Sequence, residues 1–422
     1  MITPSFSLTA TERVLPKLAL DFTTASLDPR VTFTRSGNTA TYVASTGYVT
    51  AINADLPRFD YNPVTLACKG LLIEESRINI ATYSNTFSNA AWIKSRSSIG
   101  ATPIVSPDGT SNAYKLTEDS TAANSHFMEG TAAITSGTTY TWSIFAKQGG
   151  RTQIRVRAFM TSSSSADFDL VTGTISNASG TTGTSIDNMG NGWYRCSISA
   201  LSSTTGTGYL DCFLMSGGSV TYNGDGTSGA YIYGAQFEAG AFVTSYIPNA
   251  ATGSTTRNAD VATMTGTNFS SWYNQTEGAF EVQCQTMSFA SARGIYAAGD
   301  PTKAFGAAEN IYANYFATTG TIVDNVLTGG VAVVGIVPTK TQAINTPTKN
   351  VFAYKLNSFA GSTGASTVET DNAGALPTPT GLSLGGLSQG WSGATTYLNG
   401  YLQQFYYWPQ RLTNAEVQAF SK

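Results

Sequence analysis

Apolar and polar side chains alternate with a period of two along most of the chain. Between residues 139 and 147, Tyr140, Trp142, Ile144 and Ala146 share one face. The same alternation recurs at 153–159, 194–198, 210–214, 231–237, 280–285 and 401–408. Because clusters of Gly, Ser, Asn and Pro separate these runs, the pattern predicts antiparallel strands packed as β-sandwiches.

Helix signals are almost missing from this pattern. The clearest lies near the end of the sequence, where Thr413 and Glu416 have the spacing of a capping box. We therefore expect a short helix through Phe420 in an otherwise all-β protein.

Charge divides the chain into segments. Residues 1–80 hold 14 charged side chains, seven of each sign, whereas the other 342 residues hold 35. We expect residues 1–80 to form an extended N-terminal segment, followed by a first sandwich at 81–250. A Thr- and Ser-rich linker is predicted at 251–261, and a second sandwich at 262–422.

Composition excludes several classes of protein. Only 12% of the 422 residues are charged, 11% are aromatic and 42 are glycine. Disordered chains contain fewer aromatic residues, coiled coils are rich in charged residues, and collagen requires glycine at every third position. A net charge of −3 gives no basic surface for nucleic acid, and no apolar run reaches the length of a membrane span.

Metal and nucleophile chemistry have few candidate residues. The four cysteines have no CxxC spacing, and His126 is the single histidine. The first residues lack the basic and apolar regions of a secretion signal. We expect no enzyme activity, no nucleic-acid partner, no membrane insertion and buried free thiols.

Several motifs resemble one family of tailed-bacteriophage virion proteins, which are described as head-spike or tail-fibre proteins. In the first half of the chain they are LDPRVTFTR (27–35), PRFDY (57–61), GLLIEESRIN (70–79) and NGWYR (191–195). Further along are YIYGAQFEAG (231–240), TSYIP (244–248) and TRNAD (256–260). LSLGG (382–386), LNGYL (398–402) and YWPQRLTNAEV (407–417) resemble a LamG or concanavalin-A-like domain.

The resemblance implies two jelly-roll domains, the first like a carbohydrate-binding module. It also implies a protein of the virion surface that is assembled in the host cytoplasm, is homotrimeric, and contacts capsid, portal or tail proteins through residues 1–80. We expect the lectin-like domains to bind host-surface polysaccharide. A decoration protein without a ligand and a polysaccharide depolymerase remain the alternatives.

Candidate site residues follow from their positions in the pattern. Glycans stack on exposed aromatic rings, and the rings near predicted turns are Trp92, Trp272, Tyr273 and Trp391. A charged group in the first segment is suited either to a virion interface or to ion pairs within the chain; its members are Arg30, Arg35, Arg58, Glu74, Glu75 and Arg77.

Other candidates involve carboxylates. Asp225, in a turn rich in oxygen-bearing residues, is a candidate Ca²⁺ ligand or a plain turn residue. A depolymerase would need two facing carboxylates, for which the candidate pairs are Glu74 with Glu75, Asp167 with Asp169, and Asp211 with Asp225.

Overall fold

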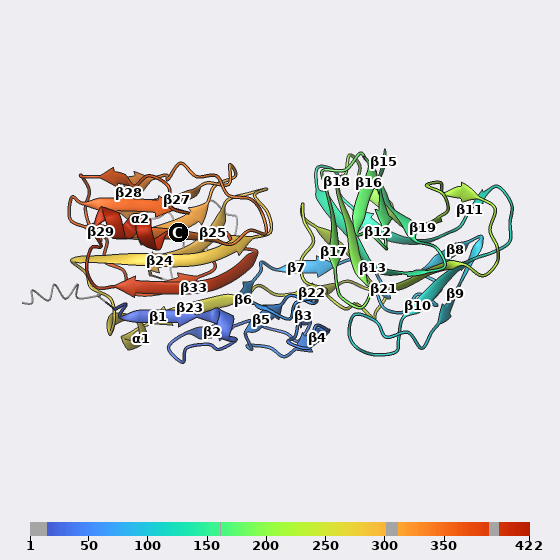
Figure 1. Cartoon of the computed structure of the whole chain (residues 1–422), viewed down its shortest axis with the longest axis horizontal. Coiled ribbons are helices and arrows are strands. Elements are labelled where there is room, and N and C mark those ends of the chain that lie inside the picture. Colours follow the sequence, from blue (N-terminus) through green and yellow to red (C-terminus); the bar gives the residue numbers. More distant parts are fainter. Residues whose placement is uncertain (1–14, 161, 301–310, 388–395) are drawn as a thin grey trace, which may run out of the picture.

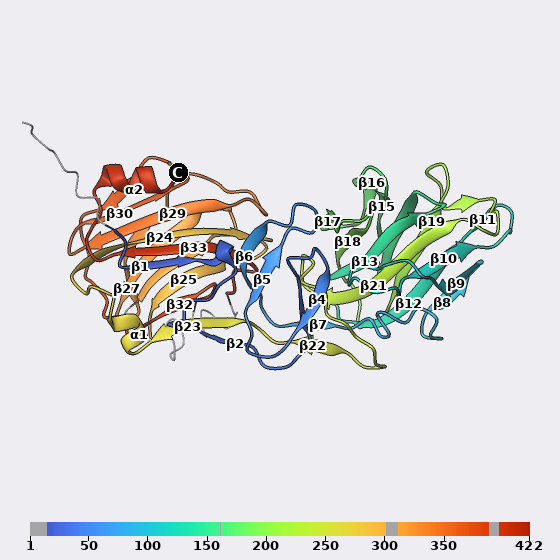
Figure 2. The same cartoon turned by 60° about the horizontal axis from the view of Figure 1, so that its bottom comes forward.

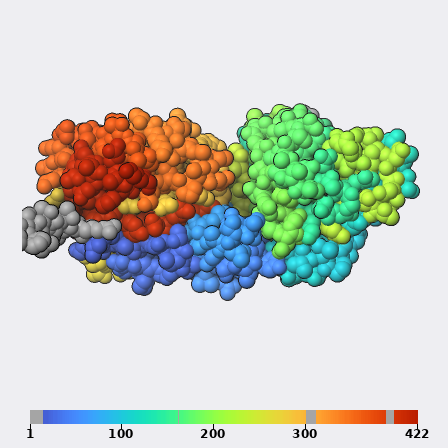
Figure 3. All heavy atoms as spheres, in the orientation of Figure 1, coloured from blue at the N-terminus to red at the C-terminus, as the bar shows by residue number. Residues whose placement is uncertain are grey.

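The computed structural model describes residues 15–160, 162–300, 311–387 and 396–422. Strands dominate these residues, and their pairing is antiparallel throughout the large sheets, which confirms the all-β prediction. The helices described are the 3-10 turn η1 (Phe22–Thr24), α1 (Thr267–Ser270) and α2 (Asn414–Phe420). Two lobes lie side by side along the long axis of the molecule (Figure 1 and Figure 3).

The middle lobe, drawn mostly in green, packs two sheets around one apolar cluster. One sheet has the order β17 (Gly183–Asn188), β18 (Tyr194–Leu201), β13 (Thr139–Gly149), β21 (Gly229–Ala239), β10 (Tyr114–Glu118) and β9 (Ser97–Ala101). The other has the order β16 (Thr174–Ser179), β15 (Ser162–Asp169), β14 (Gln153–Met160), β19 (Gly206–Met215), β12 (Phe127–Ile134) and β8 (Ile93–Ser95). Trp142 and Val156 are among the buried residues that the two sheets contribute to the shared core.

The terminal lobe contains strands from both ends of the chain. One sheet has the order β31 (Glu369–Asp371), β30 (Phe359–Thr363), β29 (Thr348–Lys355), β24 (Glu277–Thr286), β33 (Gly400–Trp408), β6 (Cys68–Ile73) and β5 (Arg58–Tyr61), with β1 (Leu18–Asp21) also paired to β33. The facing sheet has the order β2 (Thr32–Thr34), β23 (Val261–Thr265), β32 (Gly381–Leu384), β25 (Arg293–Gly299), β26 (Ile311–Phe316), β27 (Ile322–Thr328) and β28 (Val331–Ile336). Leu20, Phe280 and Leu382 share its core.

The first 80 residues differ from the extended segment that we expected. Their strands β1, β5 and β6 extend one sheet of the terminal lobe, and β2 extends the other. Figure 2 shows the blue β1 beside the red β33, and the blue β2 beside the yellow β23. Local alternation predicts that a strand exists but carries no information about a partner almost four hundred residues away, so the sequence could not reveal this pairing.

The expected linker at 251–261 is also structured. Its strand β22 (Thr255–Arg257) pairs with β7 (Arg77–Asn79), and the side chains of Arg257 and Asp260 are buried. The chain thus enters and leaves the middle lobe through two adjacent strands. Two further small ribbons are β3 (Ala40–Val43) with β4 (Val49–Ile52) and β11 (Asn124–Ser125) with β20 (Thr221–Tyr222).

The predicted C-terminal helix is confirmed with its capping box. The Thr413 side chain accepts a hydrogen bond from the Glu416 backbone N–H, and the Glu416 carboxylate accepts one from the Thr413 N–H. Val417 buries the helix against Trp408 and Leu412. Cys196, Cys212 and Cys284 are buried free thiols, as expected, while Cys68 is half-buried. Over the described residues, no helix is long and apolar enough to span a membrane.

One buried carboxyl group lies in the core of the terminal lobe, between its two sheets. Asp324 on β27 is 1% exposed and accepts hydrogen bonds from the Nδ2 atoms of Asn314 (2.5 Å) and Asn350 (3.1 Å). Asn350 belongs to the facing sheet, so the three side chains connect the two sheets. Burial raises the Asp324 pKa to about 7, although both amides lower it in part.

This carboxyl makes the stability of the terminal lobe depend on pH. Because the folded-state pKa lies above the ordinary value of 3.8, the stabilising protonated form is lost as pH rises from 4 through 7. The free energy of unfolding of the unmodified protein should fall by about 4 kcal/mol over this range. In Asp324→Asn, which has no carboxyl to titrate at this position, we expect this fall to be absent. Urea unfolding of both proteins from pH 4 to pH 8 measures this difference, and parallel curves would contradict it.

Candidate functional site

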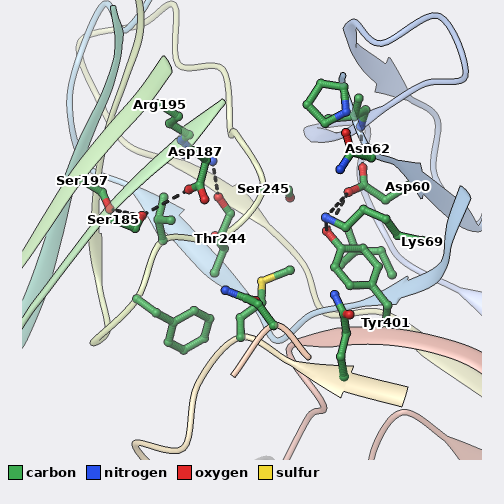
Figure 4. Close-up of a pocket in the computed structure, with 18 of the residues that line it drawn as sticks. Asp60, Asn62, Lys69, Ser185, Asp187, Arg195, Ser197, Thr244, Ser245 and Tyr401 are labelled. Carbon is green, nitrogen blue, oxygen red and sulfur yellow. Dashed lines mark hydrogen bonds and ion pairs between the residues drawn. The ribbon is translucent and has the colours of Figure 1, made fainter. Parts of the chain in front are cut away.

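A cleft of about 900 Å³ lies where the two lobes meet. Its walls come from β5, β6 and β33 of the terminal lobe and from β17 and β18 of the middle lobe. The segment 241–246, which follows β21, lines it between these walls. Figure 4 shows two groups of polar side chains facing one another across this space, with Ser245 between them. Ligand pockets of this volume occur preferentially at such domain junctions.

The wall of the terminal lobe presents Asp60, Lys69 and Tyr401. These residues belong to three neighbouring strands, β5, β6 and β33, which explains why they lie close together. The Lys69 ammonium donates to the Tyr401 hydroxyl (2.6 Å), which in turn donates to Asp60 Oδ2 (2.7 Å). Burial, with a contribution from Asp60, raises the Tyr401 pKa well above its ordinary value, so the hydroxyl stays protonated.

The wall of the middle lobe presents hydroxyls and one carboxylate. Ser185 lies opposite Ser197 in the β17–β18 ladder, and their Oγ atoms are 2.8 Å apart. Two residues along, the exposed Asp187 accepts from Ser185 Oγ at 3.2 Å. Ser185, Asp187 and Ser197 all line the cleft, so this row of polar groups faces it.

Arg195, on β18, is buried behind the same wall and hydrogen-bonds to neighbouring residues. Its Nη1 donates to the Thr244 carbonyl (2.6 Å) and its Nη2 to Ser143 Oγ (3.2 Å), while the guanidinium lies over the ring of Phe145. Burial lowers its pKa, although Glu238 and Asp187 raise it in part. A guanidinium remains charged after such a shift, so Arg195 places a positive charge beside the cleft.

Ser245 links the cleft to a group of buried ions. Its N–H and Oγ donate to the two carboxylate oxygens of Glu74 at 2.8 and 2.7 Å. Glu74 also pairs with Arg58 (2.6 Å) and Arg257 (3.0 Å). Asp260 completes the group by pairing with Arg58 and Arg35. We call Arg35, Arg58, Glu74, Arg257 and Asp260 the junction network; all are at most 1% exposed.

The network is strong enough to keep its charges while buried. Burial alone would raise the pKa of Glu74, but Arg257, Arg58 and the Ser245 hydrogen bonds lower it to about 2. Burial likewise disfavours the charged form of Arg58, yet Asp260 and Glu74 raise its pKa overall. These opposing effects mean that each charge depends on its partners remaining in place.

The structure places the six expected virion-interface residues as follows. Arg35, Arg58 and Glu74 are buried in the junction network, so their side chains are not exposed for an interface with a second protein. Arg77 pairs with Glu75 at 2.6 Å. The alternative of ion pairs within the chain therefore describes these five residues. Arg30 also pairs within the chain, with Asp28, but its side chain remains one-third exposed.

The expected aromatic platforms are also different in the structure. Trp92 is 2% exposed and stacks near Trp142, and Trp272 is 1% exposed beside Phe269. Tyr273 is half-buried and packs on the same core. These loops fold back and bury the rings, so Trp92 and Trp272 offer no surface to a sugar. Trp391 lies outside the described residues.

The exposed aromatic pair of the middle lobe lies elsewhere. Phe159 and Tyr209 are neighbours on β14 and β19, with their rings 6.2 Å apart, and they are 40% and 38% exposed. The cleft itself contains the half-buried rings of Tyr42, Tyr61 and Phe242. The alternation identified the outward face of β14, but nothing in the sequence indicated which strands would face the second lobe.

The candidate carboxylates have other partners. Asp225 Oδ1 accepts from the N–H groups of Thr227 (2.8 Å) and Ser228 (2.6 Å), the geometry of a turn, and no cluster of metal-binding side chains occurs in the described part of the chain. In the candidate catalytic pairs, Glu74 is buried in the junction network. Asp167 forms an ion pair with Arg155 (2.5 Å), and Asp211 forms one with Arg157 (2.6 Å).

Comparisons with known proteins give partial and distant likenesses. No family profile and no curated protein sequence matches the chain. A Ruminococcus gnavus IT-sialidase CBM40 bound to α2,3-sialyllactose matches at 12% identity and a TM-score of 0.30, covering 35% of this chain and 84% of its own. A Limulus polyphemus SAP-like pentraxin matches at 11% identity and 0.27, covering 35% and 70%. A Trypanosoma rangeli sialidase in complex with 2,3-difluorosialic acid matches at 8% and 0.30, covering 73% and 60%.

The junction network leads to a prediction about stability. Glu74→Gln leaves Arg58 and Arg257 buried with too little negative charge, and breaking such a pair costs about 3–5 kcal/mol. We expect the urea midpoint at pH 7 to fall accordingly. Because the folded pKa of about 2 lies below the ordinary 4.5, this contribution is present above pH 4.5 and is lost as pH falls towards 2.

Asp28→Asn is the matched control for that variant. It breaks the ion pair with Arg30, which is partly exposed to solvent. Pairs of this kind contribute about 1 kcal/mol or less, so the urea midpoint should barely change. Equal losses in the two variants would show that the junction network contributes no more than a surface pair.

Proposed function

We propose that the protein binds a glycan in the cleft between its lobes. The observation that carries the proposal is the lining of this 900 Å³ space, which combines hydroxyls and amides on both walls with the rings of Tyr42, Tyr61 and Phe242. A sugar needs many donors and acceptors for its hydroxyls and an aromatic ring against its apolar face. The cleft supplies both at once.

Most charges at the cleft are balanced by partners within the protein, Asp187 by Arg195 among them. Lys69 and Asp60 neutralise one another through Tyr401, which leaves neutral donors and acceptors on that wall. On the other wall, Asp187 extends the Ser185–Ser197 pair with acceptor oxygens. Hydrogen bonds to such groups orient a ligand, while the long-range electrostatic contribution stays small.

Calorimetry with glycans selected on an array tests this proposal. We expect Lys69→Met and Asp187→Ala, one on each wall, to weaken binding by about tenfold each, since each removes hydrogen bonds to a charged group. The paired control is Tyr209→Ser on the outer face of the middle lobe, which should bind as the unmodified protein does. No detectable glycan binding would refute the proposal, and loss in the control alone would move the site to the outer face.

Binding is proposed without cleavage. Each described carboxylate of the candidate catalytic pairs has its own partner, in a turn, an ion pair or a hydrogen bond. We therefore expect no new reducing ends when the purified protein is incubated with a glycan that it binds. Release of oligosaccharides would instead favour the depolymerase alternative.

The proposed setting is the surface of a bacteriophage particle, and its support is the resemblance of motifs such as GLLIEESRIN and TRNAD to virion proteins. Because residues 18–73 supply strands to the terminal lobe, attachment to capsid, portal or tail proteins would involve that lobe as a whole. The distal middle lobe would then carry one wall of the cleft outward.

The oligomeric state and the location in the particle are both measurable. We expect light scattering to give a mass three times the 44.3 kDa of the chain, and a density map of the intact particle to show the protein on its outside. A monomer in solution would contradict the trimer. A position inside the particle would contradict a role in adhesion.

A further inference from the structure

Positive charge exceeds negative charge where the lobes join. Besides the junction network, the buried side chains of Arg77, Arg195 and Arg293 lie in this region, together with Glu75 and Glu238. Asp187 also lies near Arg195, so six guanidiniums are matched by five carboxylates there, although the whole chain has a net charge of −3. Buried charges are normally paired, so this excess requires an explanation.

Arg77 is the least satisfied of these arginines. Its Nη2 pairs with Glu75, but its Nε and Nη1 have no hydrogen-bond partner among the described residues, and the side chain is only 7% exposed. Its guanidinium and that of Arg293 lie 4.8 and 5.1 Å from the ring centre of Phe242. Among the residues that the structure describes, Glu75 is the carboxylate that pairs with both of them.

A second hollow, of about 380 Å³, opens beside Arg77. It is lined by Glu75, Ser76, Arg77, Ala239, Gly240, Ala259 and Tyr397. Gly240 makes room for the arginine, because a Cβ atom there would lie 1.5 Å from Arg77 Nη1. The hollow is therefore lined by a fixed guanidinium, whose Nε and Nη1 are buried without hydrogen-bond partners, and by the small residues Ser76, Ala239, Gly240 and Ala259.

We infer that this hollow binds a carboxylate or sulfate group carried by an acidic saccharide. One such group would neutralise the excess charge of Arg77 and Arg293 over Glu75, and the planar guanidinium fork matches the two oxygens of an oxyanion. Burial lowers the pKa of Arg293 and Glu75 offsets this only in part, which agrees with missing negative charge. The saccharide rests on the proposed function, whereas the anion site stands on these side chains alone.

Calorimetry with small probes tests the anion site on the full chain at constant ionic strength. Glucuronate should bind, glucose should not, and free sulfate should compete with glucuronate. Arg77→Gln should weaken glucuronate binding by about tenfold or more, because a charged hydrogen bond is lost. The control is Arg30→Gln, at an arginine that is one-third exposed and does not line the hollow; it should leave glucuronate binding unchanged. Equal binding of glucuronate and glucose, or full binding by Arg77→Gln, would overturn the inference.

A pair of variants tests the missing charge without any ligand. Ala259→Asp places a carboxylate in the hollow, and Ala259→Asn fills it equally without charge. We expect the Asp variant to have the higher melting temperature at pH 7, and the difference to shrink in high salt. Equal melting temperatures would overturn the inference.

The two proposals fail separately. If neutral glycans bind in the cleft but glucuronate behaves like glucose, the anion site is wrong and the proposed function stands. If glucuronate binding depends on Arg77 while no glycan binds in the cleft, the proposed function is wrong and the anion site remains.

Discussion

The ion pairs of Arg58 with Glu74 and Asp260 join parts of the chain that are far apart in sequence. Arg58 is on β5, Glu74 follows β6, and Asp260 precedes β23. Through Ser245, the same group holds the segment that leaves the middle lobe. Both walls of the cleft therefore take their positions from one buried set of charges, whose attraction is strong because water is excluded.

The sequence predicted the strands well because alternation is a local property. Ile154, Val156 and Ala158 are buried on β14 as their spacing indicated, and Arg155 and Arg157 lie on its outer face. The sequence did not reveal where residues 1–80 belong, since their charges suggested a separate, extended segment. Their high density instead reflects internal pairing: Arg35 and Arg58 reach Asp260, more than 200 residues away.

The site was harder to predict than the fold for a related reason. The motifs EESR, TSYIP and TRNAD stood out as unusual sequences, and the structure brings Glu74, Ser245 and Arg257 from these three motifs into contact. Their role at the lobe junction explains their polar composition. The prediction that tryptophans near turns are exposed was wrong for Trp92, because a position near a turn does not determine exposure. Trp92 donates its indole N–H to the Tyr83 carbonyl and packs inward.

The insertion of one lobe within the other sets an order for folding during synthesis. The middle lobe is contiguous in sequence, so it can form as soon as residues up to β21 have left the ribosome. The terminal lobe cannot close until β33, close to the end of the chain, pairs with β1 and β6. The earliest strands to emerge are thus the last to find their partners, and they must be kept from aggregating until translation ends. Because both crossings between lobes occur at the adjacent strands β7 and β22, a different contiguous domain could replace the middle lobe in a related chain without disturbing the terminal one.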